Sequence, residues 1–283
     1  MKLKNNVLVT ADWLKSHLNE PFVKVVDATY FMPGTPRDAL SEWKGKRIPS
    51  AEFFDYDTRI CDKPSSLPHM LPSADTFSKE VGLLGIRNED TVIVYDTAGI
   101  FSSPRVWWMF KVMGHENVFV LDGGLPAWEH ANGEIDTSEP TRVEPTNYQA
   151  TFDQTRVIDK SQLLEGINNG TVNVIDVRPN ERFLGLVPEP REGVRSGHMP
   201  NAVNLPFAQL LEAGKFKSAE TLKMLIESAL SDSKRNVASC GSGVTACILA
   251  IAAEYASGDV VTVYDGSWTE WGSDHELPIV SGK

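Results

Sequence analysis

The chain has 283 residues, 41% of them hydrophobic and 23% charged, which is typical of a globular protein with room for two domains. Its formal net charge of −11 argues against general binding to nucleic acids or anionic membranes, because the long-range field would repel both. An anionic substrate would therefore need arginines concentrated at one place. The sequence shows no N-terminal apolar segment of signal-peptide length and no membrane-spanning apolar run, so we expect a cytoplasmic location.

The three cysteines, Cys61, Cys240 and Cys247, are too few and too irregularly spaced for a disulfide framework. No CxxC pair occurs, so a zinc site of the usual spacing is not indicated. Cys61 lies in a loop between proline and charged residues, with no activating group evident beside it. This cysteine usage fits a reducing compartment.

In chain order, the first half alternates strand-length apolar runs with helical patterns. Ser73 is the predicted N-cap of a helix over 74–85, and Ser103 with Pro104 opens another that runs through 105–114. Both patterns end at a glycine, as helices often do. Short buried strands between such helices predict parallel pairing.

A polar, proline-bearing segment over 136–156 has no clear apolar period and is the predicted linker. It separates a first domain at 1–135 from a second at 157–283. The clearest helical patterns of the second domain cover 218–230 and 243–256. The predicted fold class is α/β, with two tandem domains that each contain a mainly parallel sheet flanked by helices.

Four segments of the first half have matches in the second half, in the same order and at offsets between 143 and 151 residues. Such a regular offset indicates a tandem duplication of one fold. The matched pairs are VKVVDA (23–28) with VNVIDV (172–177), RIPSAEFFD (47–55) with HMPNAVNLP (198–206), TVIVYD (91–96) with NVASC (236–240), and VFVLDGGLPAW (118–128) with VTVYDGSWTEW (261–271).

Cys240 stands at the end of a predicted strand, where functional groups of α/β folds gather. Gly241 and Gly243 allow the following turn to aim backbone N–H groups inward, and such a nest before a helix stabilises negative charge. We therefore expect Cys240 to be a nucleophile that is readily available as a thiolate. Its counterpart in the first half is Asp96, so only one domain carries the thiol. Cys247, within the following helix, is predicted to be core.

Three segments carry a resemblance to a known family, and together they cover both halves. They are the loop CGSGVT (240–245), the ending YDGSWTEW (264–271) and the stretch RFLGLVPEPREGVRSGHMPNAVNLPF (182–207). The chain resembles the tandem-domain rhodaneses, sulfurtransferases with a silent first domain and an active second one. Within that family it is most similar to the 3-mercaptopyruvate sulfurtransferases.

The resemblance implies a donor. Thiosulfate-type rhodaneses resemble CRKGVT, with cationic side chains for a dianion, whereas Gly241 and Ser242 occupy those two positions here and are neutral. Arg182 and Arg191 match the family's arginines that hold the carboxylate and keto groups of mercaptopyruvate, for which planar guanidinium forks are suited. The loop residues implied to bind substrate are Gly241, Gly243, Val244 and Thr245.

The first half contributes a segment, PSSLPHMLP (64–72), that has no equivalent in the second half. His69 within it matches a family histidine that faces the active cysteine. Asp57 matches the acid that partners this histidine, although one extra residue separates the two here, and Asp62 is a rival. With Ser242, His69 and Asp57 are implied to form a serine–histidine–aspartate relay.

The implied function is transfer of sulfur from 3-mercaptopyruvate, through a Cys240 persulfide, to cyanide or to a thiol of a thioredoxin-like protein or a small molecule. Pyruvate is released in a ping-pong scheme. No metal or organic cofactor is implied, and neither a nucleic acid nor a membrane is an expected partner.

Three alternatives stay open. The nearest is a thiosulfate:cyanide sulfurtransferase, which the neutral loop disfavours. A cysteine phosphatase would need a longer cradle ending in arginine, but the residue six positions after Cys240 is Ala246. A non-catalytic sulfur carrier built on the same fold would deliver one sulfur per Cys240 and then stop.

Overall fold

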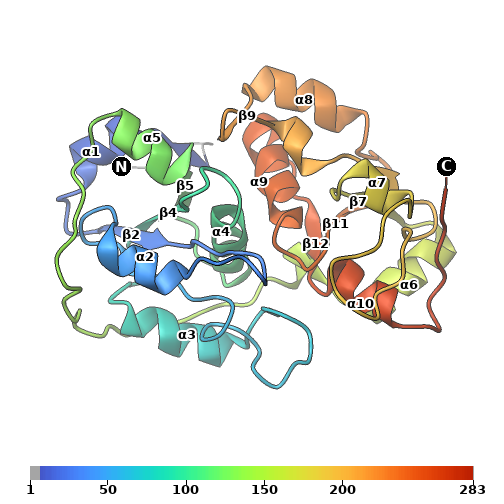
Figure 1. The fold of residues 1–283 in the computed structure, drawn as a ribbon, viewed down its shortest axis with the longest axis horizontal. Helices are drawn as coiled ribbons and strands as arrows, with labels where there is room; N and C mark the ends of the chain where they lie inside the picture. The colour runs from blue at the N-terminus through green and yellow to red at the C-terminus, as the bar shows by residue number, and fades with distance from the viewer. Residues whose placement is uncertain (1–6, 283) are drawn as a thin grey trace. The chain divides into compact units, whose positions relative to one another are not determined.

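A computed structural model describes residues 7–282 as two compact units, drawn from blue to green and from yellow to red in Figure 1. The first contains residues 7–64, Leu71–Asp153 and Ala213–Phe216, and the second contains Ser65–Met70, Gln154–Glu212 and residues 217–282. A short segment from each half of the sequence thus belongs to the unit of the other half. One of these segments, Ser65–Met70, includes the predicted site residue His69.

The first unit is a five-stranded sheet in the order β1-β5-β4-β2-β3, with every neighbouring pair parallel. Its elements are β1 (Leu8–Val9), α1 (Ala11–His17), β2 (Val23–Asp27), α2 (Ala39–Gly45), β3 (Glu52–Phe53), α3 (Ala74–Leu83), β4 (Thr91–Tyr95), α4 (Ser103–Val112), β5 (Val118–Leu121), α5 (Gly124–His130) and β10 (Lys215–Phe216).

The second unit has the same design, a parallel sheet in the order β6-β12-β11-β7-β8. Its elements are the 3₁₀ turn η1 (Gln154–Arg156), β6 (Val157–Ile158), α6 (Lys160–Asn169), β7 (Val172–Asp176), α7 (Asn180–Phe183), β8 (Val203–Asn204), the 3₁₀ turn η2 (Phe207–Leu210), β9 (Leu211–Glu212), α8 (Ala219–Glu227), β11 (Arg235–Ser239), α9 (Ala246–Ser257), β12 (Thr262–Tyr264) and α10 (Ser267–Ser273).

The strand registers confirm the predicted duplication. Asp27 pairs with Tyr95 in the first sheet, and Asp176 pairs with Ser239 in the second. Since Asp96 and Cys240 are the next residues along β4 and β11, the two occupy equivalent positions at the carboxyl ends of their sheets. The predicted fold class, two tandem α/β domains with parallel sheets, is confirmed.

Helix positions follow the local sequence signals. The Ser73 hydroxyl accepts a hydrogen bond from the Thr76 N–H at the start of α3, as an N-cap does. Helix α4 starts at Ser103 with Pro104 in its first turn. The predicted helix at 243–256 starts later, at Ala246, because Gly243 has a φ of +79° that a right-handed helix excludes.

The aromatic runs lie in the two cores. Trp107 and Trp108 in α4 and Trp268 and Trp271 in α10 have no exposed surface. In the second unit, α10 and α6 cover one face of the sheet, while α9 packs against β11 and β12. Cys247 is fully buried in α9, so its prediction as a core residue is confirmed.

The segment predicted as a linker is held along the first unit up to Asp153. The Thr146 N–H donates to the Gly82 carbonyl at 2.9 Å, and the buried Tyr148 hydroxyl lies 3.2 Å from His115 Nδ1. The Tyr148 ring also contacts Phe77 and Phe110, an anchor that the polar composition of this segment does not indicate.

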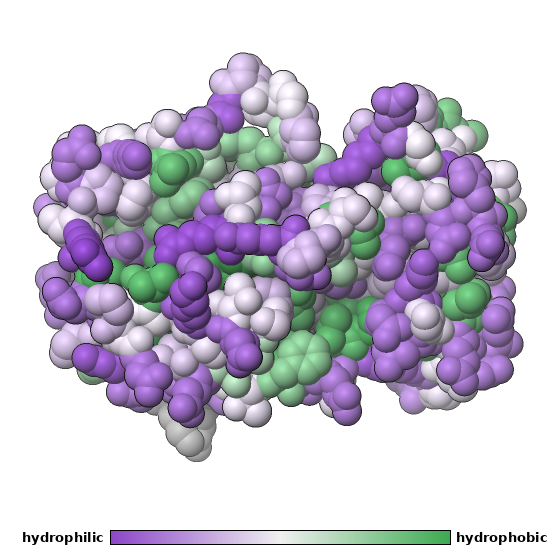
Figure 2. Space-filling model, turned by 90° about the horizontal axis from the view of Figure 1, so that it is seen from below, coloured by the Kyte–Doolittle hydropathy of each residue, from purple (hydrophilic) through white to green (hydrophobic). Residues whose placement is uncertain are grey.

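Hydrophilic residues predominate on the face seen in Figure 2, with hydrophobic residues between them. Within residues 7–282, no helix is both long and apolar enough to cross a membrane.

Candidate active site

Cys240 follows the last residue of β11 and is 1% exposed. The turn over residues 241–245 then leads into α9. Gly243 and Val244 are buried in this turn, while Gly241 and Thr245 are partly exposed. The turn is thus buried at its centre and partly exposed at both of its ends.

The equivalent turn of the first unit shows what such a loop binds. The Asp96 carboxylate fills it and accepts hydrogen bonds from four backbone N–H groups and one hydroxyl. The donors are the backbone nitrogens of Ala98 (2.9 Å), Phe101 (3.0 Å), Ser102 (3.0 Å) and Ser103 (2.8 Å) and the Ser103 Oγ (2.6 Å). The connection between strand and helix is thus an anion-binding turn that one unit fills with its own side chain.

Ser267, at the start of α10, lies against Cys240. Its hydroxyl oxygen accepts from the Cys240 N–H at 3.2 Å, donates to the Tyr264 carbonyl at 2.8 Å, and lies 3.9 Å from Cys240 Sγ. Sequence reasoning missed this residue. The repeat offered a signal, because Ser267 aligns with a glycine, Gly124, and the structure shows that both have a left-handed φ, +49° and +53°.

His69 is 2% exposed and lies with Nε2 3.0 Å from the Ser242 hydroxyl, a contact between residues 173 positions apart. Its backbone φ is +41°, an uncommon conformation for a residue other than glycine. The structure therefore brings the predicted serine and histidine together. Their hydrogen bond gives a proton a path to or from the turn that begins at Cys240.

Asp57 and Asp62 both belong to the first unit, and their side chains are exposed. His69 belongs to the second unit, so the acid of the predicted relay stays a prediction. The backbone carbonyl of Asp57 accepts from the Cys61 thiol at 3.4 Å. Burial raises the pKa of Cys61, and the neighbouring Asp55 adds to that effect, so this thiol is not an activated one.

Arg182, at the end of α7, lies over the turn. A side chain at Gly241 would place its first carbon 3.3 Å from Arg182 Nη2 and 3.8 Å from Nη1, so glycine keeps this approach open. Arg191 is partly exposed, and its guanidinium makes no hydrogen bond or ion pair with the part of the chain described, 7–282. Its role in holding a substrate stays a prediction.

Two buried charged residues near Arg182 were not predicted. The Glu189 carboxylate accepts from Arg182 Nε at 3.2 Å and from Arg178 Nη1 at 3.0 Å, and it also accepts from Arg182 Nη2. Arg178 in turn binds Asp176 and stacks over the Trp268 ring, 4.3 Å from its centre. Glu189 stands in a loop sequence rich in proline and charge, which gives no sign of burial.

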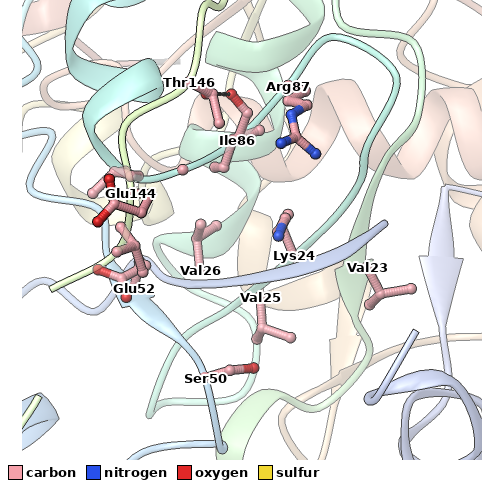
Figure 3. Close-up of a pocket in the computed structure, with 13 residues that line it drawn as sticks. Val23, Lys24, Val25, Val26, Ser50, Glu52, Ile86, Arg87, Glu144 and Thr146 are labelled. Carbon is pink, nitrogen blue, oxygen red and sulfur yellow. Dashed lines mark hydrogen bonds between the residues drawn. The ribbon is translucent and has the colours of Figure 1, made fainter. Parts of the chain in front are cut away.

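The first unit also has a pocket of about 330 Å³ beside the amino-terminal part of β2. Figure 3 shows Arg87 and Lys24 at one side and the carboxylates of Glu52 and Glu144 at the other. Burial raises the pKa of Glu52. The pocket contains no cysteine, and β2 runs from it toward the carboxyl end at which Asp96 lies, so it belongs to neither turn. Among residues 7–282, no cluster of three or more histidine, cysteine or acidic side chains could hold a metal ion.

Comparison with known proteins places the chain in a family. The model of the rhodanese-like domain matches residues 10–131 and again 159–274, so the chain belongs to the rhodanese-like domain family and contains that domain twice. It is 40% identical to the 3-mercaptopyruvate sulfurtransferase of Mus musculus and 41% identical to the thiosulfate sulfurtransferase of Bos taurus, each over 93% of this chain and 91% of the relative.

A solved structure agrees with this assignment. The crystal structure of SseA from Escherichia coli, described as a 3-mercaptopyruvate sulfotransferase with the rhodanese fold, is 34% identical. It superimposes with a TM-score of 0.84, over 93% of this chain and 99% of that one. Overall similarity is thus nearly equal for relatives named after two different donors, so the donor has to be argued from the site.

Proposed function

We propose that the chain transfers sulfur from 3-mercaptopyruvate to a thiol or cyanide through a persulfide on Cys240, and releases pyruvate. The observation that carries this proposal is the equivalence of Cys240 and Asp96. A turn that holds a carboxylate in one unit begins with a thiol in the other, so it is suited to a thiolate and to the negative charge of a persulfide sulfur.

In the first half-reaction, the Cys240 thiolate attacks the sulfur of the donor thiol. The new S–S bond forms as the donor C–S bond breaks, and the electron pair of that bond goes to carbon as the enolate of pyruvate. The donor's thiol proton stays on the outer sulfur or passes to the Ser242–His69 pair, whose 3.0 Å contact supports this route. Protonation of the enolate gives pyruvate.

The donor is assigned from charge. Mercaptopyruvate carries one negative charge on its carboxylate, whereas thiosulfate carries two close to the sulfur that is transferred. Gly241 and Ser242 give the turn no cation, and the guanidinium of Arg182 is paired with Glu189. A neutral turn beside one partly compensated arginine favours the singly charged donor. Arg191 is proposed to bind the same carboxylate or the keto oxygen.

In the second half-reaction, an acceptor thiolate attacks the outer sulfur, and Cys240 leaves as the thiolate. A thioredoxin-like protein or a small thiol is the proposed acceptor, and cyanide would take the sulfur as thiocyanate. We also propose a cytoplasmic location, which fractionation of cells expressing the tagged chain would test.

The decisive experiment is a steady-state comparison of mercaptopyruvate and thiosulfate with one thiol acceptor. We expect kcat/KM to favour mercaptopyruvate at least about tenfold, a difference of 1.4 kcal/mol in transition-state binding. Cys240→Ser should abolish multiple turnover and the sulfur adduct seen by mass spectrometry. Preference for thiosulfate would contradict the donor assignment. A single turnover per chain would instead indicate a sulfur carrier.

The Ser242–His69 pair has its own test. His69→Ala should lower kcat for mercaptopyruvate by about 10²-fold, in the range of a lost general acid or base. His275→Ala, which removes an exposed histidine of the same unit, is the matched control and should leave kcat unchanged. Equal rates for both variants would remove His69 from the mechanism.

A further inference from the structure

Glu189 links the arginine of the turn to a buried charge network in the second unit. Its carboxylate is 3% exposed and contacts Arg178 at 3.0 Å and Arg182 through both Nε and Nη2. Arg178 is 1% exposed and binds Asp176 Oδ2 at 2.6 Å. Two acids and two arginines therefore form one chain of ion pairs whose formal charges cancel.

This arrangement pairs two sides of the Arg182 guanidinium with one carboxylate. Nε and Nη2 are held by Glu189, while Nη1 makes no hydrogen bond within residues 7–282. Nη2 and Nη1 lie 3.3 and 3.8 Å from the position that a side-chain carbon on Gly241 would occupy. The guanidinium thus faces the turn with both terminal nitrogens, and the Glu189 carboxylate in direct contact with Nη2 and 3.2 Å from Nε reduces the positive potential there.

The local sequence holds Glu189 in place. Pro188 and Pro190 flank it, and proline fixes its own φ and restricts the residue before it to extended conformations. The stacking of Arg178 on Trp268 and its bond to the Gly197 carbonyl at 2.7 Å leave the other partner of Glu189 equally immobile. The carboxylate is therefore held at the site by its contacts with two arginines and by a restricted backbone.

We infer that Glu189 is a specificity-determining residue, which lowers the positive charge beside Cys240 and so selects a singly charged sulfur donor over a doubly charged one. This inference rests on the proposed function. Neutral turn residues and a compensated arginine act in the same direction, because a dianion gains more than a monoanion from each positive charge that is left uncompensated.

The test is the donor ratio of Glu189→Gln, which removes the charge and keeps the shape. We expect kcat/KM for thiosulfate relative to mercaptopyruvate to rise about tenfold, measured on the full chain. Glu189→Asp keeps the charge and alters the position, so it should slow both donors and leave their ratio unchanged. An equal shift of the ratio in both variants would mean that Glu189 acts by position, which overturns the inference.

A second readout does not depend on sulfur transfer. The rates at which iodoacetate and iodoacetamide alkylate Cys240, followed by peptide mass spectrometry, compare an anionic with a neutral reagent. Glu189→Gln should raise the iodoacetate-to-iodoacetamide ratio, while Glu254→Gln, which breaks a 2.9 Å ion pair with Arg156 in the same unit, should not. An unchanged ratio in Glu189→Gln overturns the inference.

The two readouts separate the two claims. A raised alkylation ratio in a chain that turns over neither donor would support the charge effect of Glu189 and contradict the proposed function. Melting temperatures of all three variants identify any loss of fold, and if Glu189→Gln does not fold, Glu189→Ala, which also removes the charge, takes its place.

Discussion

In the first unit, the turn after β4 closes around the Asp96 carboxylate, while in the second the turn after β11 begins with the Cys240 thiol. The carboxylate is held by five donors at 2.6 to 3.0 Å. A buried anion that is so well bound contributes to stability, and it occupies the donors that the turn would otherwise offer to a bound anion. The same strand-to-helix turn can therefore stabilise the fold in the first unit and present a reactive group in the second.

A second pair of equivalent residues makes the same point. Asp176 is neutralised by Arg178 two positions later, whereas Asp27 is followed two positions later by Thr29, whose N–H donates at 2.8 Å. Burial is the main cause that raises the pKa of Asp27 to about 6. Arg178, which joins Asp176 to Glu189 in the second unit, thus has no counterpart in the first.

The largest expected effect is on stability in the first unit. Asp96→Ala leaves five donors without their acceptor and should lower the free energy of unfolding of this unit by about 3 to 5 kcal/mol. Cys240→Ala should cost only about 1 kcal/mol, because a buried cysteine packs as a small apolar residue. Hydrogen exchange of β4 and β11 peptides measures the two units separately. Similar losses in both would break the contrast between a structural anion and a chemical thiol.

The next effect is expected for Asp176→Asn. It leaves Arg178 with one buried partner fewer and should destabilise the second unit by about 3 kcal/mol. It should also raise kcat/KM for thiosulfate relative to mercaptopyruvate, since Arg178 helps to hold Glu189. Chemical denaturation and steady-state kinetics on the same sample check both parts. A stable variant with an unchanged donor ratio would show that the charge chain is not needed.

The last expected effect is a gain in stability, for Asp27→Asn in the first unit. Asp27 has a raised pKa, so its contribution to stability is full below pH 4 and is lost as the pH rises through about 6. Asp27→Asn should therefore stabilise the first unit by up to about 3 kcal/mol at pH 7 and by nothing at pH 4. Denaturation curves between these pH values measure the gain. A loss of stability at pH 7 would mean that the Asp27 carboxylate is adequately solvated or paired.

The regular elements and the position of the nucleophile could be predicted from the sequence. Local signals such as the Ser73 cap, the β-branched strands and the glycine turn after Cys240 act over a few residues, so they survive in a linear reading. The ordered repeats indicated the duplication, and the strand registers place Asp96 and Cys240 at equivalent positions of their own sheets, as expected. The burial of Tyr148 within the predicted linker was not foreseen, because it comes only from side chains distant in the chain.

Two α/β domains, a cysteine at the carboxyl end of a strand and a turn able to hold negative charge could be predicted from residues close together in the chain. The pairing of His69 with Ser242 was implied by the family resemblance and is present at 3.0 Å. The position of Ser267 against the thiol and the burial of Glu189 between two arginines are seen only in the folded chain. The physical reason is that these contacts join loops at the edge of a sheet. Their energies depend on burial and charge pairing, which no periodicity along the chain records.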